Sequence, residues 1–160
     1  MTLMLAGARN LYPGVQAMLG PNEIKRDCNY FGQHFTGSTL GIIGMGNIGF
    51  QIAKRLVMNY PLTSPKYEII SRAHFGFNCK ILYHNRNEKE YAKEVNASYY
   101  KELNDMLPEC DFVCVICNLT EETRHIIGKE QFDLMKPTAV FCNVSRGGTV
   151  DQEAMLDCLK

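Results

Sequence analysis

The sequence has no excess of charge of either sign. Its 17 lysines and arginines balance 17 aspartates and glutamates. Domains that bind nucleic acid or anionic membranes typically carry a basic excess, so neither partner is expected. The apolar runs are also all shorter than the roughly 20 residues that a membrane-spanning helix needs. We therefore expect a protein with neither nucleic acid nor a membrane among its partners.

The first residues have little in common with a secretory signal. Residues 1–8 are mostly apolar, but no basic leader precedes them and Arg9 ends them early. Without such a signal, the seven cysteines are expected to be reduced thiols and the chain to be cytoplasmic. Cys114 and Cys117 form a C-x-x-C pattern inside a predicted strand, where residues i and i+3 point to opposite faces. We interpret them as buried structural cysteines, and no residue is assigned to a metal.

Apolar runs alternate with helical patterns along the 160 residues. This alternation predicts an α/β fold with a doubly wound parallel sheet. Strands are expected at residues 39–43, 79–84, 97–100, 111–117 and 138–143. Helices are expected at residues 2–11, from 47 onward, and at 87–94, 100–107, 129–135 and 152–159, with a further helix start at 120–123.

Two stretches are expected to be irregular. Pro13 and Gly14 should break the first helix, so residues 12–37 are expected to form an extended connection. Residues 57–72 contain two prolines and lie between the first predicted crossover helix and the second strand. We interpret them as an insertion that loops out of the domain.

A glycine pattern lies between the first strand and the helix that follows it. Gly44, Gly46 and Gly49 match G-x-G-x-x-G, and Asn47 and Ile48 open the helix. Gly44 would permit the tight turn, Gly46 would let the backbone approach a pyrophosphate, and Gly49 would let the helix pack closely on the strand. The helix N-terminus offers free N–H groups to phosphates. Together these features predict a dinucleotide site.

The end of the second strand indicates which dinucleotide is preferred. Enzymes that use NAD place an acidic residue there, where it accepts a hydrogen bond from the ribose 2′-hydroxyl. Here the position holds neutral Asn85, followed by Arg86, which suits a 2′-phosphate. We expect NADP(H) to be preferred, with NAD(H) possible.

The fifth strand ends beside an arginine. Arg146 follows this strand and precedes Gly147 and Gly148. Because ligands of open α/β sheets bind at the carboxyl ends of strands, its guanidinium is well placed for a carboxylate. From spacing alone, a surface arginine in a salt bridge is an equally good interpretation of Arg146.

Four motifs in this order resemble the D-isomer-specific 2-hydroxyacid dehydrogenases, and the resemblance covers nearly the whole chain except the expected insertion at residues 57–72. They are Gly44-Met45-Gly46-Asn47-Ile48-Gly49, Asn118-Leu119-Thr120-Glu121-Glu122-Thr123, Met135-Lys136-Pro137-Thr138-Ala139-Val140 and Asn143-Val144-Ser145-Arg146-Gly147-Gly148-Thr149-Val150-Asp151. Ile81-Leu82-Tyr83-His84-Asn85-Arg86 and the strand end at Cys117 are similar to the glyoxylate/hydroxypyruvate reductases of that family.

The resemblance implies a two-lobed oxidoreductase that transfers a hydride between a nicotinamide cofactor and a small 2-keto or 2-hydroxy acid. It implies that Arg146 is catalytic and binds the substrate carboxylate, and that the chain forms a homodimer through this lobe. The cofactor-binding residues that it implies, together with those argued above, are Gly44, Gly46, Asn47, Ile48, Gly49, Asn85, Arg86, Asn118, Thr123 and Val144.

The resemblance also implies that the chain is a fragment. Residues 1–37 are similar to the family's inter-lobe helix and connection, and residues 38–160 to its NAD(P)-binding domain, so the substrate lobe is expected to be missing. None of the four histidines occupies the position of the family's catalytic histidine. Two alternatives remain open: a noncatalytic module that binds NADP(H) or dimerises, and another Rossmann enzyme of the adenosylhomocysteinase or formate dehydrogenase type.

Overall fold

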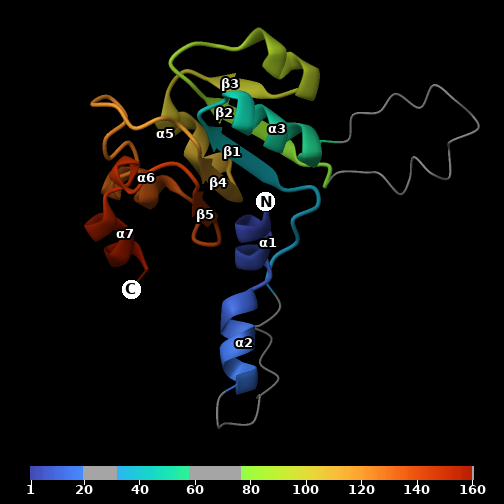
Figure 1. Ribbon diagram of the computed structural model, residues 1–160, viewed down its shortest axis with the longest axis vertical. Helices are drawn as coiled ribbons and strands as arrows, with labels where there is room; N and C mark the ends of the chain where they lie inside the picture. Colours follow the sequence, from blue (N-terminus) through green and yellow to red (C-terminus); the bar gives the residue numbers. More distant parts are fainter. Residues whose placement is uncertain (20–31, 58–76, 160) are drawn as a thin grey trace, which may run out of the picture.

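The fold is organised around a parallel sheet. The computed structural model describes residues 1–19, 32–57 and 77–159 (Figure 1). Five strands form one sheet in the order β3-β2-β1-β4-β5, and all pairs are parallel. They are β1 (Thr39–Ile43), β2 (Lys80–His84), β3 (Ser98–Tyr100), β4 (Phe112–Val115) and β5 (Val140–Asn143). Because the chain returns from the edge strand β3 to β4, the strand order reverses between β1 and β4, where open sheets of this kind bind ligands.

Helices cover both faces of the sheet. One face is covered by α1 (Thr2–Ala8), α3 (Asn47–Leu56) and the 3₁₀ helix η3 (Glu90–Val95). The other is covered by α5 (Leu103–Met106), η4 (Leu107–Glu109), α6 (Lys129–Leu134) and α7 (Gln152–Cys158), and η5 spans Gly147–Thr149. Along the strands, Leu40, Ile42, Ile81, Tyr83, Phe112 and Cys114 pack in one core cluster, and Ile43, Leu82, Val113 and Val115 in the other. This alternation explains why the strands read as continuous apolar runs.

The predicted doubly wound α/β fold is confirmed. The first strand has its predicted bounds, and α3 begins at Asn47 as expected. The other strands lie at their predicted places with shorter bounds. The Asp151 carboxylate accepts hydrogen bonds from the N–H groups of Glu153 and Ala154, so it caps α7 as expected.

The N-terminal prediction was wrong in its boundaries. The first helix, α1, ends at Ala8, and a second helix, α2 (Leu11–Leu19), contains Pro13 and Gly14. Asn10 has φ 48, which places it in the left-handed region and separates the two helices. Pro13 lies in the first turn of α2, where a backbone N–H has no partner within the helix, so proline is tolerated. Figure 1 shows α2 projecting away from the sheet.

Three further helix predictions were also wrong in detail. Residues 120–123 form a turn rather than a helix start, because the Thr123 hydroxyl accepts from the Thr120 N–H and donates to the Asn118 carbonyl. Such local side-chain bonds compete with helix formation. The helix expected at 100–107 is reduced to α5, after which Pro108 takes part in η4. The helix expected at 87–94 is the 3₁₀ helix η3.

The expected insertion falls, apart from Val57, outside the described residues, as does His74.

Candidate cofactor and substrate site

The parallel sheet brings four predicted segments to one edge. The last residues of neighbouring strands pair in register: His84 with Ile43, Ile43 with Val115, and Val115 with Asn143. The segments that follow β1, β2, β4 and β5 therefore leave the same edge. They carry the glycine pattern, Asn85 with Arg86, the 118–123 turn, and Arg146.

Two of the three glycines are required by the chain's own packing. Gly44 has φ +104, and a Cβ there would lie 2.6 Å from the Cys117 backbone nitrogen. A Cβ on Gly49 would lie 2.7 Å from the Gly44 carbonyl oxygen. These contacts place the start of α3 against the ends of β1 and β4, as expected for a dinucleotide fold.

For the third glycine, the described residues give no such packing reason. Gly46 has φ −95 and ψ −163, which is extended backbone, and a Cβ there would meet nothing within 4 Å. As the N-cap of α3, Gly46 makes no side-chain cap, so the first N–H groups of the helix are open to a ligand. Asn47 and Ile48 are exposed at this position. The open space and free donors fit a pyrophosphate.

The loop between these glycines is held by side chains from two distant segments. The Met45 N–H donates to the Asn85 Oδ1 at 2.8 Å, and the Tyr91 hydroxyl donates to the Met45 carbonyl at 2.7 Å. The Tyr99 hydroxyl donates in turn to the Asn85 carbonyl. The Asn85 side chain is thus turned toward the loop. The sequence analysis missed Tyr91 and Tyr99, and no local pattern could have found them, since both act across the fold.

The Arg86 side chain, just after β2, forms an ion pair with a residue in the turn after β4. Arg86 Nη2 lies 2.9 Å from the Glu122 Oε2, in the turn after β4. The two side chains are 73% and 69% exposed. Arg86 is therefore at the surface, as a phosphate partner must be, and it already has an acidic partner.

The turn after β4 is folded by its own threonines. The Thr123 hydroxyl donates to the Asn118 carbonyl at 2.6 Å, and the Asn118 side chain is exposed. The hydroxyl of Thr123 is thus used inside the turn. Val144, which follows β5, is 44% exposed and donates its N–H to the Val115 carbonyl.

Arg146 has a fixed backbone and an exposed side chain. Its carbonyl accepts hydrogen bonds from the Asn143 amide at 3.0 Å and from the Thr149 hydroxyl at 2.7 Å. Its guanidinium donates only to the Ser145 carbonyl, at 3.2 Å, and takes part in no ion pair among the described residues. The salt bridge that was the alternative interpretation of Arg146 is absent from the described part of the chain.

No described histidine is held by an acid beside Arg146. His34 and His125 are exposed, and the half-buried ring of His84 lies 3.1 Å from the Tyr100 carbonyl. The backbone of His125 does bond to Gly148, but its side chain forms no ion pair with a described carboxylate. The edge therefore carries an exposed arginine that forms no ion pair with a described carboxylate, and no described histidine beside it is held by an acid.

The cysteine prediction is confirmed for Cys114, which is buried in β4, but Cys117 is only partly buried and lies two residues beyond the end of that strand. Cys114 belongs to the core cluster on one face of the sheet, while Cys117 packs against the other cluster. Burial raises the pKa of the Cys117 thiol, which is the opposite of what a redox-active cysteine needs. All six described cysteines are free. The described residues contain neither a group of three potential metal ligands nor a helix of the length and hydropathy that crossing a membrane requires.

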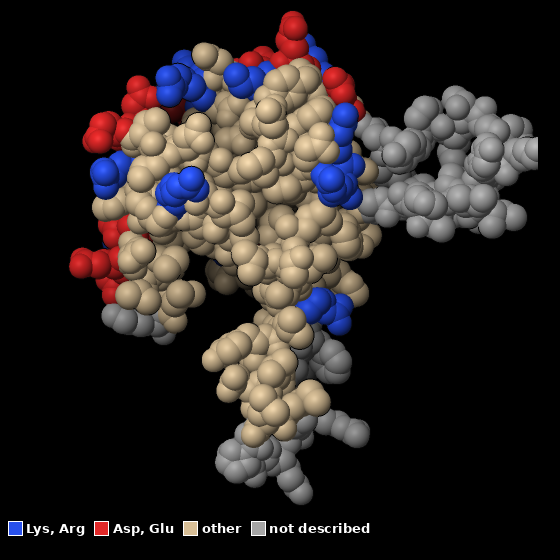
Figure 2. All heavy atoms as spheres, viewed as in Figure 1, with Lys and Arg blue, Asp and Glu red and all other residues tan. Residues whose placement is uncertain are grey.

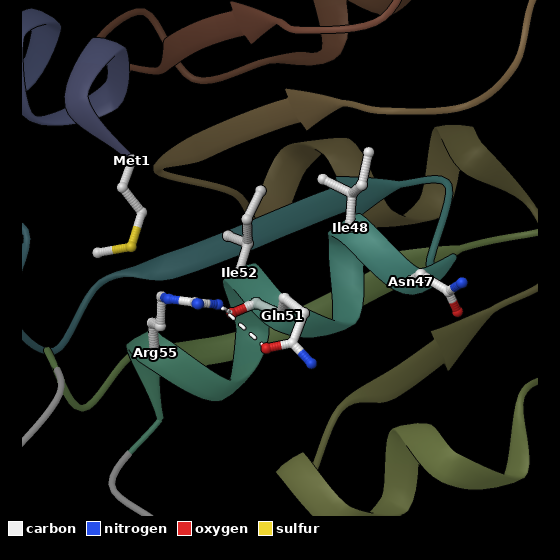
Figure 3. Close-up of a pocket in the computed structure, with 6 residues that line it drawn as sticks. All are labelled: Met1, Asn47, Ile48, Gln51, Ile52 and Arg55. Carbon is white, nitrogen blue, oxygen red and sulfur yellow. Dashed lines mark hydrogen bonds between the residues drawn. The ribbon is translucent and has the colours of Figure 1, made fainter.

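A groove of about 460 Å³ begins at the N-terminus of α3. Figure 3 shows it along the exposed face of this helix, with Met1 on its far side. Ile48 and Ile52 point into it, and Arg55 is turned back onto Gln51. It is lined by Met1, Asn47, Ile48, Gln51, Ile52 and Arg55, so it includes two of the predicted cofactor residues but neither Arg86 nor Arg146.

The geometry agrees with a comparison against known families. The NAD-binding domain of the D-isomer specific 2-hydroxyacid dehydrogenases matches residues 1–61 and 67–160. The chain belongs to this family. The match is to the family's NAD-binding domain, which supports a nicotinamide cofactor.

Individual relatives agree with the family assignment. The chain is 42% identical to glyoxylate/hydroxypyruvate reductase B of Enterobacter sp. (strain 638) over 82% of its own length and 36% of the relative. It is 40% identical to the same enzyme of Cronobacter sakazakii over 100% of its own length and 44% of the relative. The chain thus spans about two fifths of the length of these relatives.

Solved structures show the same fold. A glyoxylate reductase from Paecilomyes thermophila is 31% identical with a TM-score of 0.74, covering 99% of this chain and 42% of that one. The NAD-complexed D-isomer specific 2-hydroxyacid dehydrogenase from Lactobacillus delbrueckii ssp. bulgaricus is 22% identical with a TM-score of 0.79, covering 99% and 42%. The second likeness, at this identity, concerns the fold alone.

Proposed function

We propose that this chain is the cofactor-binding part of a reductase that converts glyoxylate or hydroxypyruvate to the 2-hydroxy acid with NADPH. The observation that carries the proposal is the placement of the glycine loop, Arg86 and Arg146 at one edge of the parallel sheet. The relatives reported above are glyoxylate/hydroxypyruvate reductases, which supports small 2-keto acids as the substrate class. Residues 38–160 would be the cofactor domain and residues 1–37 the connection to a substrate lobe.

The geometry of the loops supports a proposed set of cofactor contacts. The pyrophosphate would lie on the N–H groups of Asn47 and Ile48, in the space beside Gly46. Arg86 would bind the 2′-phosphate and favour NADPH over NADH, with NADH still accepted. The residues proposed to complete the site are Gly44, Gly49, Asn85, Asn118, Thr123 and Val144, of which Asn85 and Thr123 act by holding their loops.

Arg146 is the residue proposed to bind the substrate. Its planar guanidinium can bind the substrate carboxylate through two parallel hydrogen bonds and polarise the keto oxygen. The bound nicotinamide would supply the hydride. The keto oxygen also needs a proton, and no described histidine is placed to donate it. A positioned general acid is worth about 10²- to 10⁴-fold in rate, so we propose that this chain alone is a poor catalyst.

Binding and turnover test the proposal separately. We expect NADPH to bind more tightly than NADH when both are titrated by fluorescence at one salt concentration, and Arg86→Glu to weaken NADPH more than NADH. We expect no oxidation of NADPH at 340 nm with either keto acid. Tighter binding of NADH would contradict the cofactor preference. Turnover that is abolished by Arg146→Ala would show that a residue of this chain donates the proton.

We also propose that the chain pairs with a second copy through α2. This helix contains no charged residue and no buried residue. Figure 2 shows it as a largely uncharged projection below a body whose charged side chains gather on its rim. Its large exposed apolar residues are Leu11, Tyr12, Val15, Met18 and Leu19. A noncatalytic role as a dimerisation module, the second candidate function, rests on this surface.

The free cysteines are consistent with a cytoplasmic location.

A further inference from the structure

We infer that Glu122 is a specificity-determining residue that lowers the preference for NADPH by competing with the cofactor's 2′-phosphate for Arg86. The inference rests on the proposed dinucleotide site and deepens it. It starts from the ion pair in which Arg86 Nη2 lies 2.9 Å from Glu122 Oε2.

The two partners come from opposite sides of the cofactor edge. Arg86 follows β2, whereas Glu122 lies in the turn after β4, and β1 lies between these two strands in the sheet. Because Arg86 and Glu122 follow the strands on either side of β1, the pair spans the edge where β1 ends and the glycine loop begins. In dinucleotide folds the adenosine ribose lies at the end of β2, so its 2′-position falls beside Arg86.

The pair is weak enough to be exchanged. Both side chains are more than two-thirds exposed, at 73% and 69%, and exposed ion pairs contribute little to stability. A 2′-phosphate brings a charge of about −1.5 to −2, together with acceptor oxygens that match a guanidinium. It would thus replace the Glu122 carboxylate on Arg86.

Only NADPH, which carries the 2′-phosphate, competes with Glu122 for Arg86. At this position NADH carries a neutral 2′-hydroxyl, so it does not compete with Glu122 for Arg86, and the charged pyrophosphate is common to both cofactors. The acid should therefore reduce NADPH affinity while leaving NADH affinity almost unchanged. Its effect is on the ratio of the two dissociation constants, which the proposed preference for NADPH alone does not predict.

The neighbouring residue supplies a matched control. Glu121 carries the same charge, is 93% exposed, and lies 4.0 Å from Arg124 rather than on Arg86. Replacement of either glutamate by glutamine changes the net charge equally. Only Glu122→Gln removes the competitor of the phosphate.

The test is a titration of the full chain with NADPH and NADH at one ionic strength. Glu122→Gln should raise the ratio of the NADH to the NADPH dissociation constant by about two- to fivefold, the range that an exposed ion pair provides. Glu121→Gln should change the ratio by less than about 1.5-fold, because its charge is screened at a longer distance. In an Arg86→Gln background, Glu122→Gln should have no further effect on the ratio.

Three results would overturn the inference: an unchanged ratio in Glu122→Gln, an equal gain in Glu121→Gln, or a gain that persists without Arg86. If the unaltered chain binds neither cofactor, the proposed dinucleotide site itself is refuted. If it binds both cofactors and the ratio does not respond to Glu122→Gln, only the role of Glu122 is refuted.

Discussion

At the scale of single residues, the glycine pattern divides into two physical roles. The packing of the chain itself requires Gly44, because a Cβ would lie 2.6 Å from the Cys117 nitrogen and φ is +104. Gly46 is extended, and a Cβ there would face open space. One motif thus contains a position where the fold itself requires glycine and a position where the described chain leaves space for a ligand.

This difference predicts opposite outcomes for two alanine substitutions. Gly44→Ala should lower the free energy of unfolding by about 3 kcal/mol or more, through strain and the close contact. Gly46→Ala should change it by less than about 1 kcal/mol, while weakening both NADPH and NADH by about tenfold or more through the methyl group that faces the pyrophosphate. Urea unfolding and fluorescence titration measure the two effects. Unaltered cofactor affinity in Gly46→Ala would remove the main argument for the pyrophosphate position.

At the scale of the elements, one carboxylate connects the amino ends of two central strands to the segment before β5. Asp111 precedes β4, and its carboxylate accepts from the Thr39 N–H at 2.8 Å and from Lys136 Nζ at 2.7 Å. Burial acts to raise the pKa of the Asp111 carboxyl, but the hydrogen bonds from Lys136 and Thr39 outweigh it and hold the pKa below its ordinary value.

A lowered pKa makes the contribution of Asp111 depend on pH. Its stabilisation is present above the pKa of the unfolded state, near 3.8, and is lost as the pH falls through the lower folded value. Asp111→Asn should therefore cost about 1–3 kcal/mol of unfolding free energy at pH 7, and progressively less below about pH 4. Denaturant unfolding at several pH values measures the difference.

Asp133 provides the comparison for this substitution. It pairs with Lys129 at 3.1 Å, but the two side chains are 59% and 78% exposed. Asp133→Asn should cost less than about 0.5 kcal/mol, as exposed helical pairs do. If the two variants lose equal stability, or if the loss in Asp111→Asn does not change between pH 7 and pH 3, the proposed connection between the strands is wrong.

At the scale of the whole molecule, the shape is set by one helix that leaves the body. No residue of α2 is buried, and Met18 is 73% exposed. An apolar projection of this kind is stable in water when a partner covers it. We therefore expect a dimer in sedimentation equilibrium, and Met18→Glu should weaken its association by about tenfold or more.

Leu156→Glu is the control for the dimer. Leu156 is 58% exposed in α7, away from the projecting helix, so the same change of an exposed apolar residue tests charge without touching α2. Equal association in both variants and in the unaltered chain would show that the α2 surface is not the interface.

The sequence alone determined those features that depend on neighbours along the chain. The bounds of β1, the start of α3 at Asn47 and the cap at Asp151 follow from an apolar run, a glycine turn and a side chain within reach of nearby N–H groups. Because these signals are local, no knowledge of the distant chain was needed. The order of the motifs was equally sufficient for the family and the doubly wound sheet.

The tertiary structure decided whatever joins segments that are distant in sequence. The sequence pattern could not show that the side chains of Asn85 and Tyr91 bond to the Met45 backbone, or that Arg86 pairs with Glu122. These contacts depend on the sheet order, which places the ends of β2 and β4 on either side of β1. The sequence thus predicted which residues follow the strands at this edge of the sheet, and only the packing of the strands determined which of them bond to one another and which are exposed.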